Sequence, residues 1–350
     1  MTQWAPYGDF QAATLLSLAT PDPRALVGDE GFLGLPLAEI VPYGTFRDDE
    51  GELYSLVRRQ WPGAEDNTGK IIVFSTRGDD KNLTIDRAGK HAVGNASITR
   101  QLVGSSLEMT SAATAEGKSS RLRWSGSEIS WSEGDLLDVS GPLIGSGTQW
   151  YLPRPHGRMI YCSQFYFGEG TLLGRPIRGF IGFDQVYLPP RRRLYVDDPW
   201  VGEKASEGLE LAWYTWGTRY TDGSWEVGQF AAGHGRSGVA FISSSDGTEV
   251  ATTDIDVVVE PESDGYWARH VHFTVAGDAW QFDPDPRGRM TSFGELPNPQ
   301  QEGRMHRPGE DRQPEVWWSW GETYPTHGRR RRGIDTTAQR HPGVAAPDFR

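Results

Sequence analysis

Asp184 is the side chain with the clearest potential for chemistry. It lies in a strand-like segment beside Phe183 and close to Val186 and Tyr187. Loss of hydration in such an apolar setting raises the pKa of a carboxyl group and keeps a proton available near neutral pH. Asp184 is therefore a candidate general acid. The alternative is a structural role, in which Asp184 pairs with a nearby arginine or caps a turn.

His270 and His272 form a second candidate group. They are two residues apart on a predicted strand, so both rings face the same side of it. Such a pair could bind a metal or shuttle a proton, and we include both among the catalytic candidates. Because no third metal ligand is recognisable, an outward-facing polar stripe is the competing interpretation.

Aromatic side chains could line a ligand site. Tyr161 could donate a hydrogen bond to a reacting group, and we count it among the catalytic candidates. The predicted substrate-binding residues are also aromatic: Tyr166, Phe183, Tyr187, Trp213, Trp216 and Trp280. Packing in the hydrophobic core is the alternative for each of them.

Sequence motifs that commonly indicate a cofactor, a metal or a catalytic nucleophile are absent. Cys162 is the single cysteine, so it can form no internal disulfide, and we expect it to be buried. The sequence contains no GxGxxG before a helix, GxxxxGK[ST], HExxH or GxSxG. We therefore expect neither an organic cofactor nor a metal.

Charge and composition limit the partners of the protein. The formal net charge is −12 over 350 residues, which disfavours binding to nucleic acid or to an anionic membrane. No stretch approaches the roughly 20 apolar residues of a membrane span, and the N-terminal residues do not resemble a signal peptide. We expect a cytoplasmic protein with a hydrophobic small-molecule substrate.

Alternation of apolar and polar residues is the main structural signal. It occurs at residues 53–57, 121–124, 127–132, 209–213, 255–259, 269–275 and 316–320. Turn motifs at 221–224 and 245–248, with 43 Gly and 23 Pro overall, indicate many short strands. The sequence predicts an all-β protein of antiparallel strands.

A few segments interrupt this pattern. Residues 9–18 and 33–41 are the helix candidates, and the polar segment 297–314 is expected to be a long surface loop. A proline and arginine cluster between Tyr187 and Trp200 suggests a domain boundary. We predict domains at 1–195 and 196–327, followed by a disordered tail at 328–350.

Three segments resemble the end of the first domain of a known family. They are Tyr161-Cys162-Ser163-Gln164, residues 170–179 from Gly170 to Gly179, and Phe183-Asp184-Gln185. They are similar to the pattern that closes the first domain of the carotenoid hydratase and hydroxyneurosporene synthase-like family. Residues 213–223 resemble the opening of that family's second domain, and residues 317–322 also show a weak similarity to the family. Many members have Trp-Asp-His where this chain has Phe183-Asp184-Gln185, so only the aspartate carries over.

The resemblance implies two antiparallel, lipocalin-like (calycin-type) β-barrels in tandem. It also implies cofactor-independent hydration, isomerisation or cyclisation of an unsaturated, hydrophobic isoprenoid or polyketide-like molecule. Such chemistry needs an acid near the double bond and an apolar wall, and barrels of about eight strands can enclose one small ligand. A non-catalytic carrier of a lipophilic molecule and a carbohydrate-active β-sandwich are the alternatives.

Overall fold

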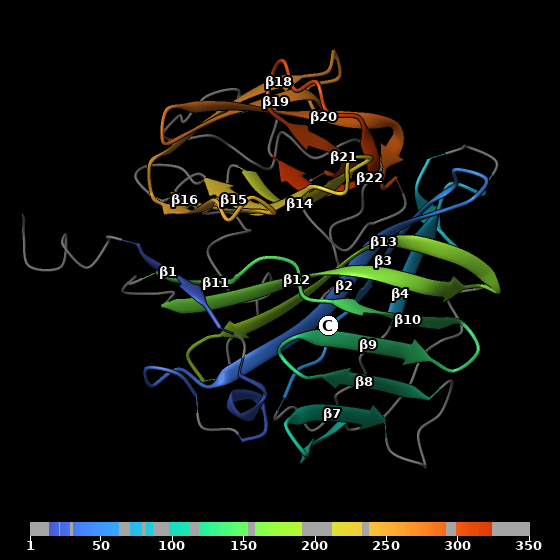
Figure 1. Ribbon diagram of the computed structural model, residues 1–350, viewed down its shortest axis with the longest axis vertical. Coiled ribbons are helices and arrows are strands. Elements are labelled where there is room, and N and C mark those ends of the chain that lie inside the picture. The colour runs from blue at the N-terminus through green and yellow to red at the C-terminus, as the bar shows by residue number, and fades with distance from the viewer. Residues whose placement is uncertain are drawn as a thin grey trace, which may run out of the picture.

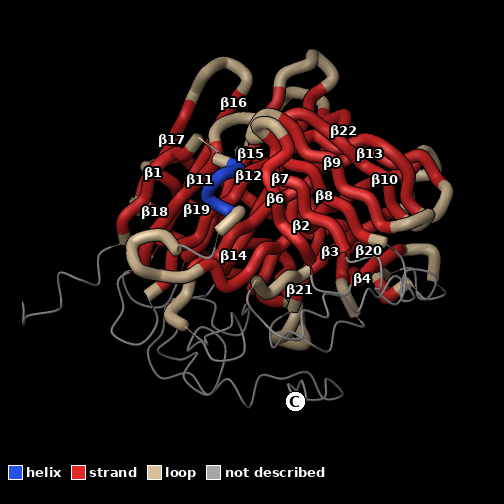
Figure 2. The backbone as a smooth tube through the Cα atoms, turned by 90° about the horizontal axis from the view of Figure 1, so that it is seen from below, coloured by secondary structure: helices blue, strands red, loops and turns tan. Residues whose placement is uncertain are grey.

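The computed structural model describes residues 14–20, 22–28, 31–62, 71–78, 82–86, 98–111, 119–152, 158–190, 212–232, 238–291 and 299–323. Within these ranges, nearly all regular structure is antiparallel β-strand (Figure 2), and one short 3₁₀ turn, η2 (Pro23–Leu26), is capped by the Asp22 side chain. The strands form two sheets that follow one another along the chain.

The first sheet has 13 strands in the order β5-β4-β3-β2-β13-β12-β10-β9-β8-β7-β6, with β11 pairing to β12 and β1 to β11. Its strands are β1 (Leu15–Ala19), β2 (Leu37–Asp48), β3 (Leu53–Arg58), β4 (Ile71–Ser75), β5 (Thr84–Ile85), β6 (Ile98–Val103), β7 (Ser106–Ser111), β8 (Ser120–Trp124), β9 (Glu128–Glu133), β10 (Leu137–Pro142), β11 (Gly147–Leu152), β12 (Met159–Leu172) and β13 (Arg175–Tyr187).

The second sheet has nine strands in the order β17-β16-β15-β14-β22-β21-β20-β19-β18. They are β14 (Ala212–Tyr220), β15 (Trp225–Ala232), β16 (Gly238–Ser244), β17 (Glu249–Thr252), β18 (Ile255–Pro261), β19 (Ala268–Val275), β20 (Asp278–Arg289), β21 (Gln300–His306) and β22 (Pro314–Thr323). This sheet curls so far that β18, at one end, contacts β15 and β16 near the other end. It is therefore nearly closed, as a barrel would be.

The burial of the strands shows how the two sheets meet. Strands β8 and β18 alternate between buried and exposed residues, as expected where one face meets solvent. Strands β13 and β14 are buried along almost their whole length, on both faces. The reason is that β14 and β22 of the second sheet lie over β2, β12 and β13 of the first (Figure 1).

The buried apolar side chains consequently form three groups. One lies on the inner side of the first sheet and includes Phe183 and Trp124. Another lies inside the second sheet and includes Trp216 and Trp280. The third combines side chains from both sheets, and we call it the inter-sheet layer: Tyr43, Tyr161, Phe165, Phe180, Trp213, Trp318 and Trp320, with their apolar neighbours.

The all-β prediction, with two antiparallel units in tandem, is confirmed. The alternating segments at 121–124, 255–259 and 316–320 are strands, and both predicted turns connect paired strands. The sheets divide between Tyr187 and Ala212, while the predicted boundary at 195/196 and the tail at 328–350 lie outside the described residues.

Three local predictions are wrong. Residues 15–18 form strand β1 rather than a helix, and β2 begins at Leu37 within the second helix candidate. The segment predicted as a loop at 297–314 contains strand β21. Its polar residues are buried because β21 pairs with β20 and β22, so their polarity does not mark exposure.

The described part of the chain contains no helix long and apolar enough to cross a membrane.

Candidate active site

Asp184 lies in the inter-sheet layer, not on the inner side of the first sheet. Its side chain is 2% exposed and projects from β13. Along a strand, alternate residues face opposite sides, so Asp184 faces the second sheet while Phe183 faces the first sheet's interior. Ser163 on β12 lies directly opposite Asp184 in the strand pairing.

Three hydroxyl groups surround the Asp184 carboxyl group. Tyr161 Oη donates a hydrogen bond to Oδ2 at 2.5 Å, and Ser163 Oγ donates to Oδ1 at 2.7 Å. Tyr43 Oη, from β2, approaches Oδ1 at 3.4 Å and is the weakest of the three. Among the residues that the structure describes, no arginine or lysine forms an ion pair with Asp184.

Gly182 makes room for the Tyr43 contact. It lies opposite Tyr43 in the pairing of β13 with β2, two residues before Asp184. A Cβ atom at position 182 would lie 2.2 Å from Cζ of Tyr43, which is far inside van der Waals contact. The absence of a side chain there lets the Tyr43 ring cross β13 and reach the carboxyl group.

Burial controls the ionisation of Asp184. Loss of hydration raises its pKa to about 7, against the hydrogen bonds from Tyr161, Ser163 and Tyr43, which lower it. The carboxyl group of Glu322 on β22 adds to the rise. Near neutral pH, Asp184 therefore populates both the acid and the carboxylate form, as an efficient proton donor and acceptor requires.

Gln229 connects this site to a second row of polar groups. From β15 of the second sheet, Gln229 Nε2 donates to Ser163 Oγ at 3.1 Å. Its Oε1 accepts hydrogen bonds from Trp150 Nε1 at 3.2 Å and from Thr148 Oγ1 at 3.3 Å. All of these groups are buried. This series of hydrogen bonds therefore orients the Ser163 hydroxyl toward Asp184.

Aromatic rings enclose the carboxyl group. The Tyr43 ring lies 6.2 Å from Trp213 and 6.0 Å from both Trp318 and Trp320, between ring centroids. Tyr161 stacks on Trp150 at 5.3 Å. These faces exclude water and can stabilise a positive charge that develops beside them.

The structure brings together three of the predicted site residues: Asp184, Tyr161 and Trp213. Tyr166, Phe183 and Tyr187 lie in the core group of the first sheet, on the opposite side of β12 and β13. There, Tyr166 Oη accepts a hydrogen bond from Trp124 Nε1, and Phe183 lies 5.0 Å from the Trp124 ring. Trp216 and Trp280 pack against each other at 4.8 Å inside the second sheet.

The structure does not bring His270 and His272 to Asp184. Both lie on β19, with side chains 38% and 39% exposed. His270 Nδ1 is 2.8 Å from Asp283, and His272 Nε2 is 3.1 Å from Glu260. These contacts match the outward-facing polar stripe that was the competing interpretation.

The described residues form neither a metal centre nor a reactive thiol. Within the described ranges, no three His, Cys, Asp or Glu side chains are grouped so as to hold a metal ion. Burial raises the pKa of Cys162 to about 12, which keeps its thiol protonated.

Sequence reasoning missed Tyr43, Gln229 and the role of Ser163. Ser163 stands within a segment that carried the family resemblance, two residues after Tyr161 on the same face of β12, and that spacing could have identified it. Tyr43 is 141 residues from Asp184, and Gln229 belongs to the other sheet. No local signal indicates either contact.

No protein-family model matches the chain, and no curated protein matches it in sequence. A Nitrosomonas europaea protein with a provisional assignment as AttH is similar in structure, at 16% identity and a TM-score of 0.45, over 83% of this chain and 93% of that one. CghA in its complex with Sch210972 is similar at 11% identity and a TM-score of 0.41, over 89% and 98% of the two chains. Kievitone hydratase from Nectria haematococca is similar at 8% identity and a TM-score of 0.39, over 88% and 92%. One of these structural neighbours is thus named as a hydratase.

Proposed function

We propose that the protein is a cofactor-independent enzyme that protonates an unsaturated, hydrophobic small molecule of isoprenoid or polyketide type. Asp184 is the general acid, and the inter-sheet layer is the reaction site. The observation that carries the proposal is a fully buried carboxyl group, without a cationic partner among the described residues, whose pKa is raised to about 7 among aromatic rings.

The proposed first step is proton transfer from Asp184 to one carbon of a double bond. The π electrons form the new C–H bond, and the other carbon becomes a cation. The Asp184 carboxylate left behind accepts hydrogen bonds from Tyr161 and Ser163, which favour the charged form. The faces of Tyr43, Trp213 and Trp318 favour the cation.

The fate of the cation defines the reaction class. Addition of water with loss of a proton gives hydration, loss of a neighbouring proton gives isomerisation, and attack by a second double bond gives cyclisation. Cyclisation leaves a new cation, which also loses a neighbouring proton. In all three reactions the Asp184 carboxylate accepts the proton that is lost, so the residue is regenerated without an external reagent.

The surroundings do not favour the carbohydrate-active alternative. Trp213, Trp318 and Trp320 are 8%, 1% and 4% exposed, so they do not form an open platform on which a sugar could stack. A carrier of lipophilic molecules could use the same aromatic layer. It would have no use for a proton-donating carboxyl group, and only the enzyme requires Asp184 to titrate.

The test is incorporation of solvent atoms into product. We would incubate the protein with a panel of isoprenoid and polyketide-derived alkenes in deuterium oxide or in heavy-oxygen water and analyse products by mass spectrometry. The proposal predicts carbon-bound deuterium in every product and heavy oxygen in hydrated ones. Asp184→Asn should abolish both, and Asp138→Asn, on the exposed side of β10, should abolish neither. Equal incorporation by the wild-type protein and Asp184→Asn would exclude Asp184 as the acid.

A further inference from the structure

Glu302 is a second fully buried carboxyl group at the inter-sheet layer. It lies on β21, is 1% exposed and is paired directly opposite Trp320 of β22. Neither of its carboxyl oxygens makes a hydrogen bond of normal geometry to a described residue, although the Thr45 hydroxyl acts on it as a donor. Burial raises the pKa of Glu302 well above its usual range, although Arg47 acts in the other direction. Burial thus favours the protonated form of Glu302, in which one carboxyl oxygen carries an O–H donor.

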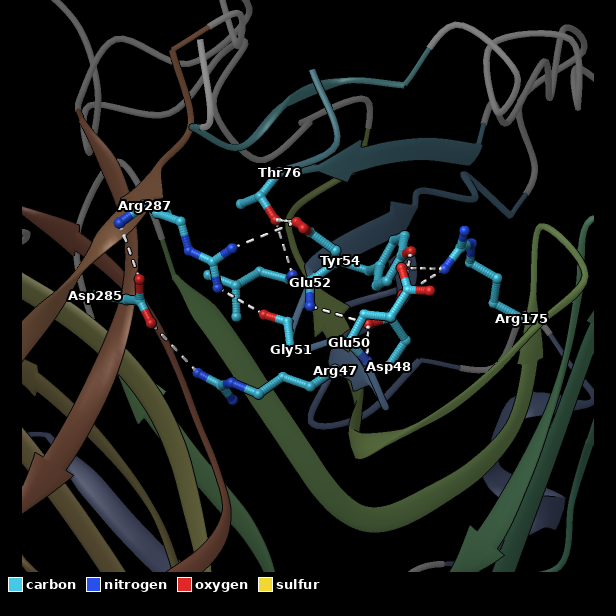
Figure 3. Close-up of polar contacts among 11 residues, drawn as sticks. Arg47, Asp48, Glu50, Gly51, Glu52, Tyr54, Thr76, Arg175, Asp285 and Arg287 are labelled. Atoms are coloured by element: carbon cyan, nitrogen blue, oxygen red, sulfur yellow. Dashed lines mark hydrogen bonds and ion pairs between the residues drawn. The ribbon is translucent and has the colours of Figure 1, made fainter. Parts of the chain in front are cut away.

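Arg47 approaches the same place from the first sheet. Its guanidinium lies 4.1 Å above the Trp317 ring and donates a hydrogen bond to the Trp317 carbonyl oxygen. The Nη2 atom is 3.8 Å from Asp285 and makes no hydrogen bond within the described part of the chain. Figure 3 shows the Arg47 side chain extending across to Asp285 of β20.

A network of ion pairs fixes this end of the layer. Arg287 contacts Glu52 at 3.4 Å and donates a hydrogen bond to the Gly51 carbonyl oxygen at 2.6 Å (Figure 3). These contacts tie β20 of the second sheet to the turn between β2 and β3 of the first. These contacts hold the two sheets against each other beside Arg47 and Glu302.

Thr45 contributes a third polar atom, and its hydroxyl favours the charged form of Glu302. It lies between Tyr43 and Arg47 on the same face of β2, and its Oγ1 makes no hydrogen bond of normal geometry to any described residue. Native proteins rarely leave buried polar groups unpaired, since each loses its hydration without compensation. Three such groups at one place indicate that a ligand oxygen or water completes their hydrogen bonds.

We propose that Glu302, Arg47 and Thr45 form a subsite for an uncharged carbonyl or hydroxyl oxygen of the ligand. This inference rests on the proposed function, because it places the ligand's double bond at Asp184. Tyr43 contacts Asp184, and Thr45 and Arg47 follow it on the same face of β2. Successive same-face residues on a strand are roughly 7 Å apart. The oxygen should therefore lie roughly 7 to 14 Å from the reacting double bond. The substrate class becomes an oxygenated isoprenoid or polyketide rather than a pure hydrocarbon.

The test compares two probes that differ in one oxygen. β-Ionone is an unsaturated isoprenoid ketone, and its hydrocarbon analogue lacks the carbonyl group. Binding of each would be measured by quenching of tryptophan fluorescence, because Trp318 and Trp320 line the layer. The wild-type protein should bind the ketone about tenfold more tightly, as one hydrogen bond to an otherwise unpaired buried donor implies.

The variants separate a binding role from a structural one. Glu302→Leu should lose the ketone preference, keep the hydrocarbon affinity and unfold at a higher temperature, because an unpaired buried polar group is replaced by an apolar one. Glu302→Gln, which retains a hydrogen-bond donor, should keep most of the preference. Glu128→Leu, on the exposed side of β9, is the matched control and should change none of these values.

Several results would overturn the subsite. Equal binding of both probes by the wild-type protein would assign the position to water, and absence of quenching by either probe would exclude binding. For Glu302→Leu, an unchanged ketone preference or a lower melting temperature would contradict the subsite. Asp184→Asn should keep the ketone preference while losing turnover. The subsite and the acid role of Asp184 can therefore fail independently.

Discussion

Glu133, inside the first sheet, and Asp184, in the inter-sheet layer, are both buried carboxyl groups, but only Glu133 has a cationic partner. Arg58 Nη1 lies 2.7 Å from Glu133 Oε2, and Ser120 and Trp131 donate hydrogen bonds to Oε1. Asp184 has three hydroxyl donors and no arginine or lysine ion pair within the described residues. Burial raises the pKa of both carboxyl groups, but at Glu133 the Arg58 guanidinium opposes that rise, whereas at Asp184 only hydroxyl groups do.

The comparison shows how one fold uses burial in two ways. A buried ion pair holds a structure together only while both partners are present. A buried carboxyl group that is surrounded by hydroxyls is poised between two protonation states, and such groups are typical of functional sites. Both carboxyl groups are buried, so the difference between the two regions is the type of group that contacts each carboxyl group: a guanidinium in one and hydroxyls in the other.

The largest expected effect is on turnover in Asp184→Asn. The amide keeps the shape of the side chain but cannot donate a proton, so turnover should fall by roughly 10² to 10⁴, the range for loss of general acid catalysis. Circular dichroism should show an unchanged fold. Normal turnover in the folded variant would move the acid to another residue.

Removal of Arg58 should have a large effect on stability. Arg58→Met leaves Glu133 buried without its counter-charge, and we expect a loss of roughly 3 to 5 kcal/mol in the free energy of unfolding. Denaturant titration would measure it. The double variant Arg58→Met/Glu133→Leu, which removes both charges, should recover most of the loss. A change below about 1 kcal/mol in the single variant would erase the proposed contrast with Asp184.

Gln229→Leu should have an intermediate effect. It removes the bridge from Trp150 and Thr148 to Ser163 and leaves buried polar groups unpaired, which costs roughly 1 to 3 kcal/mol. Turnover should fall as well, because the Ser163 hydroxyl loses its orientation. Gln101→Leu, at an exposed position of β6, is the control for the same substitution. Equal stability of the two variants would show that the bridge does not matter.

His270→Ala and His272→Ala should have the smallest effects. Their side chains are more than a third exposed, and substitutions at such positions usually change stability by less than about 0.5 kcal/mol. Turnover should be unchanged, as steady-state assays would establish. A large loss of turnover in either variant would restore these histidines as catalytic candidates.

The fold was predictable from the sequence where one face of a strand meets solvent. Strands β8 and β18 show period-two alternation because one face of each is exposed to solvent. Strand β21 was not predicted because its polar side chains are buried: Glu302 lies at the inter-sheet layer, while Gln301 forms hydrogen bonds with the backbone of Ala268 on β19. Strand β2 escaped because burial on both faces removes the alternation.

The candidate site was predictable only in its locally encoded part. Asp184 and Tyr161 could be selected because each lies in an apolar segment that carried the family resemblance. Tyr43, Gln229 and Glu302 could not, since their significance depends on the packing of the two sheets against each other. The aromatic candidates Phe183 and Trp216 show the same limitation, because alternation alone does not reveal which face of a sheet meets its partner.

The ionisation of Asp184 has a consequence for stability that needs no substrate. Its pKa is raised in the folded protein, from 3.8 to about 7, so the folded state holds the proton more tightly than the unfolded state does. Well below pH 3.8 the group is protonated in both states and has no net effect. As the pH rises from about 4 to about 7, the wild-type protein should lose about 4 kcal/mol relative to Asp184→Asn, at 1.36 kcal/mol per pKa unit.

The most direct measurement of the central claim is an NMR titration of the Asp184 side-chain carboxyl carbon, assigned by its absence in Asp184→Asn. The account predicts a titration midpoint near pH 7, with the acid and carboxylate forms equally populated there. A midpoint near the ordinary aspartate value of 3.8 would contradict it. Asp184 would then be a carboxylate throughout the neutral range and could not be the proton donor of the inter-sheet layer.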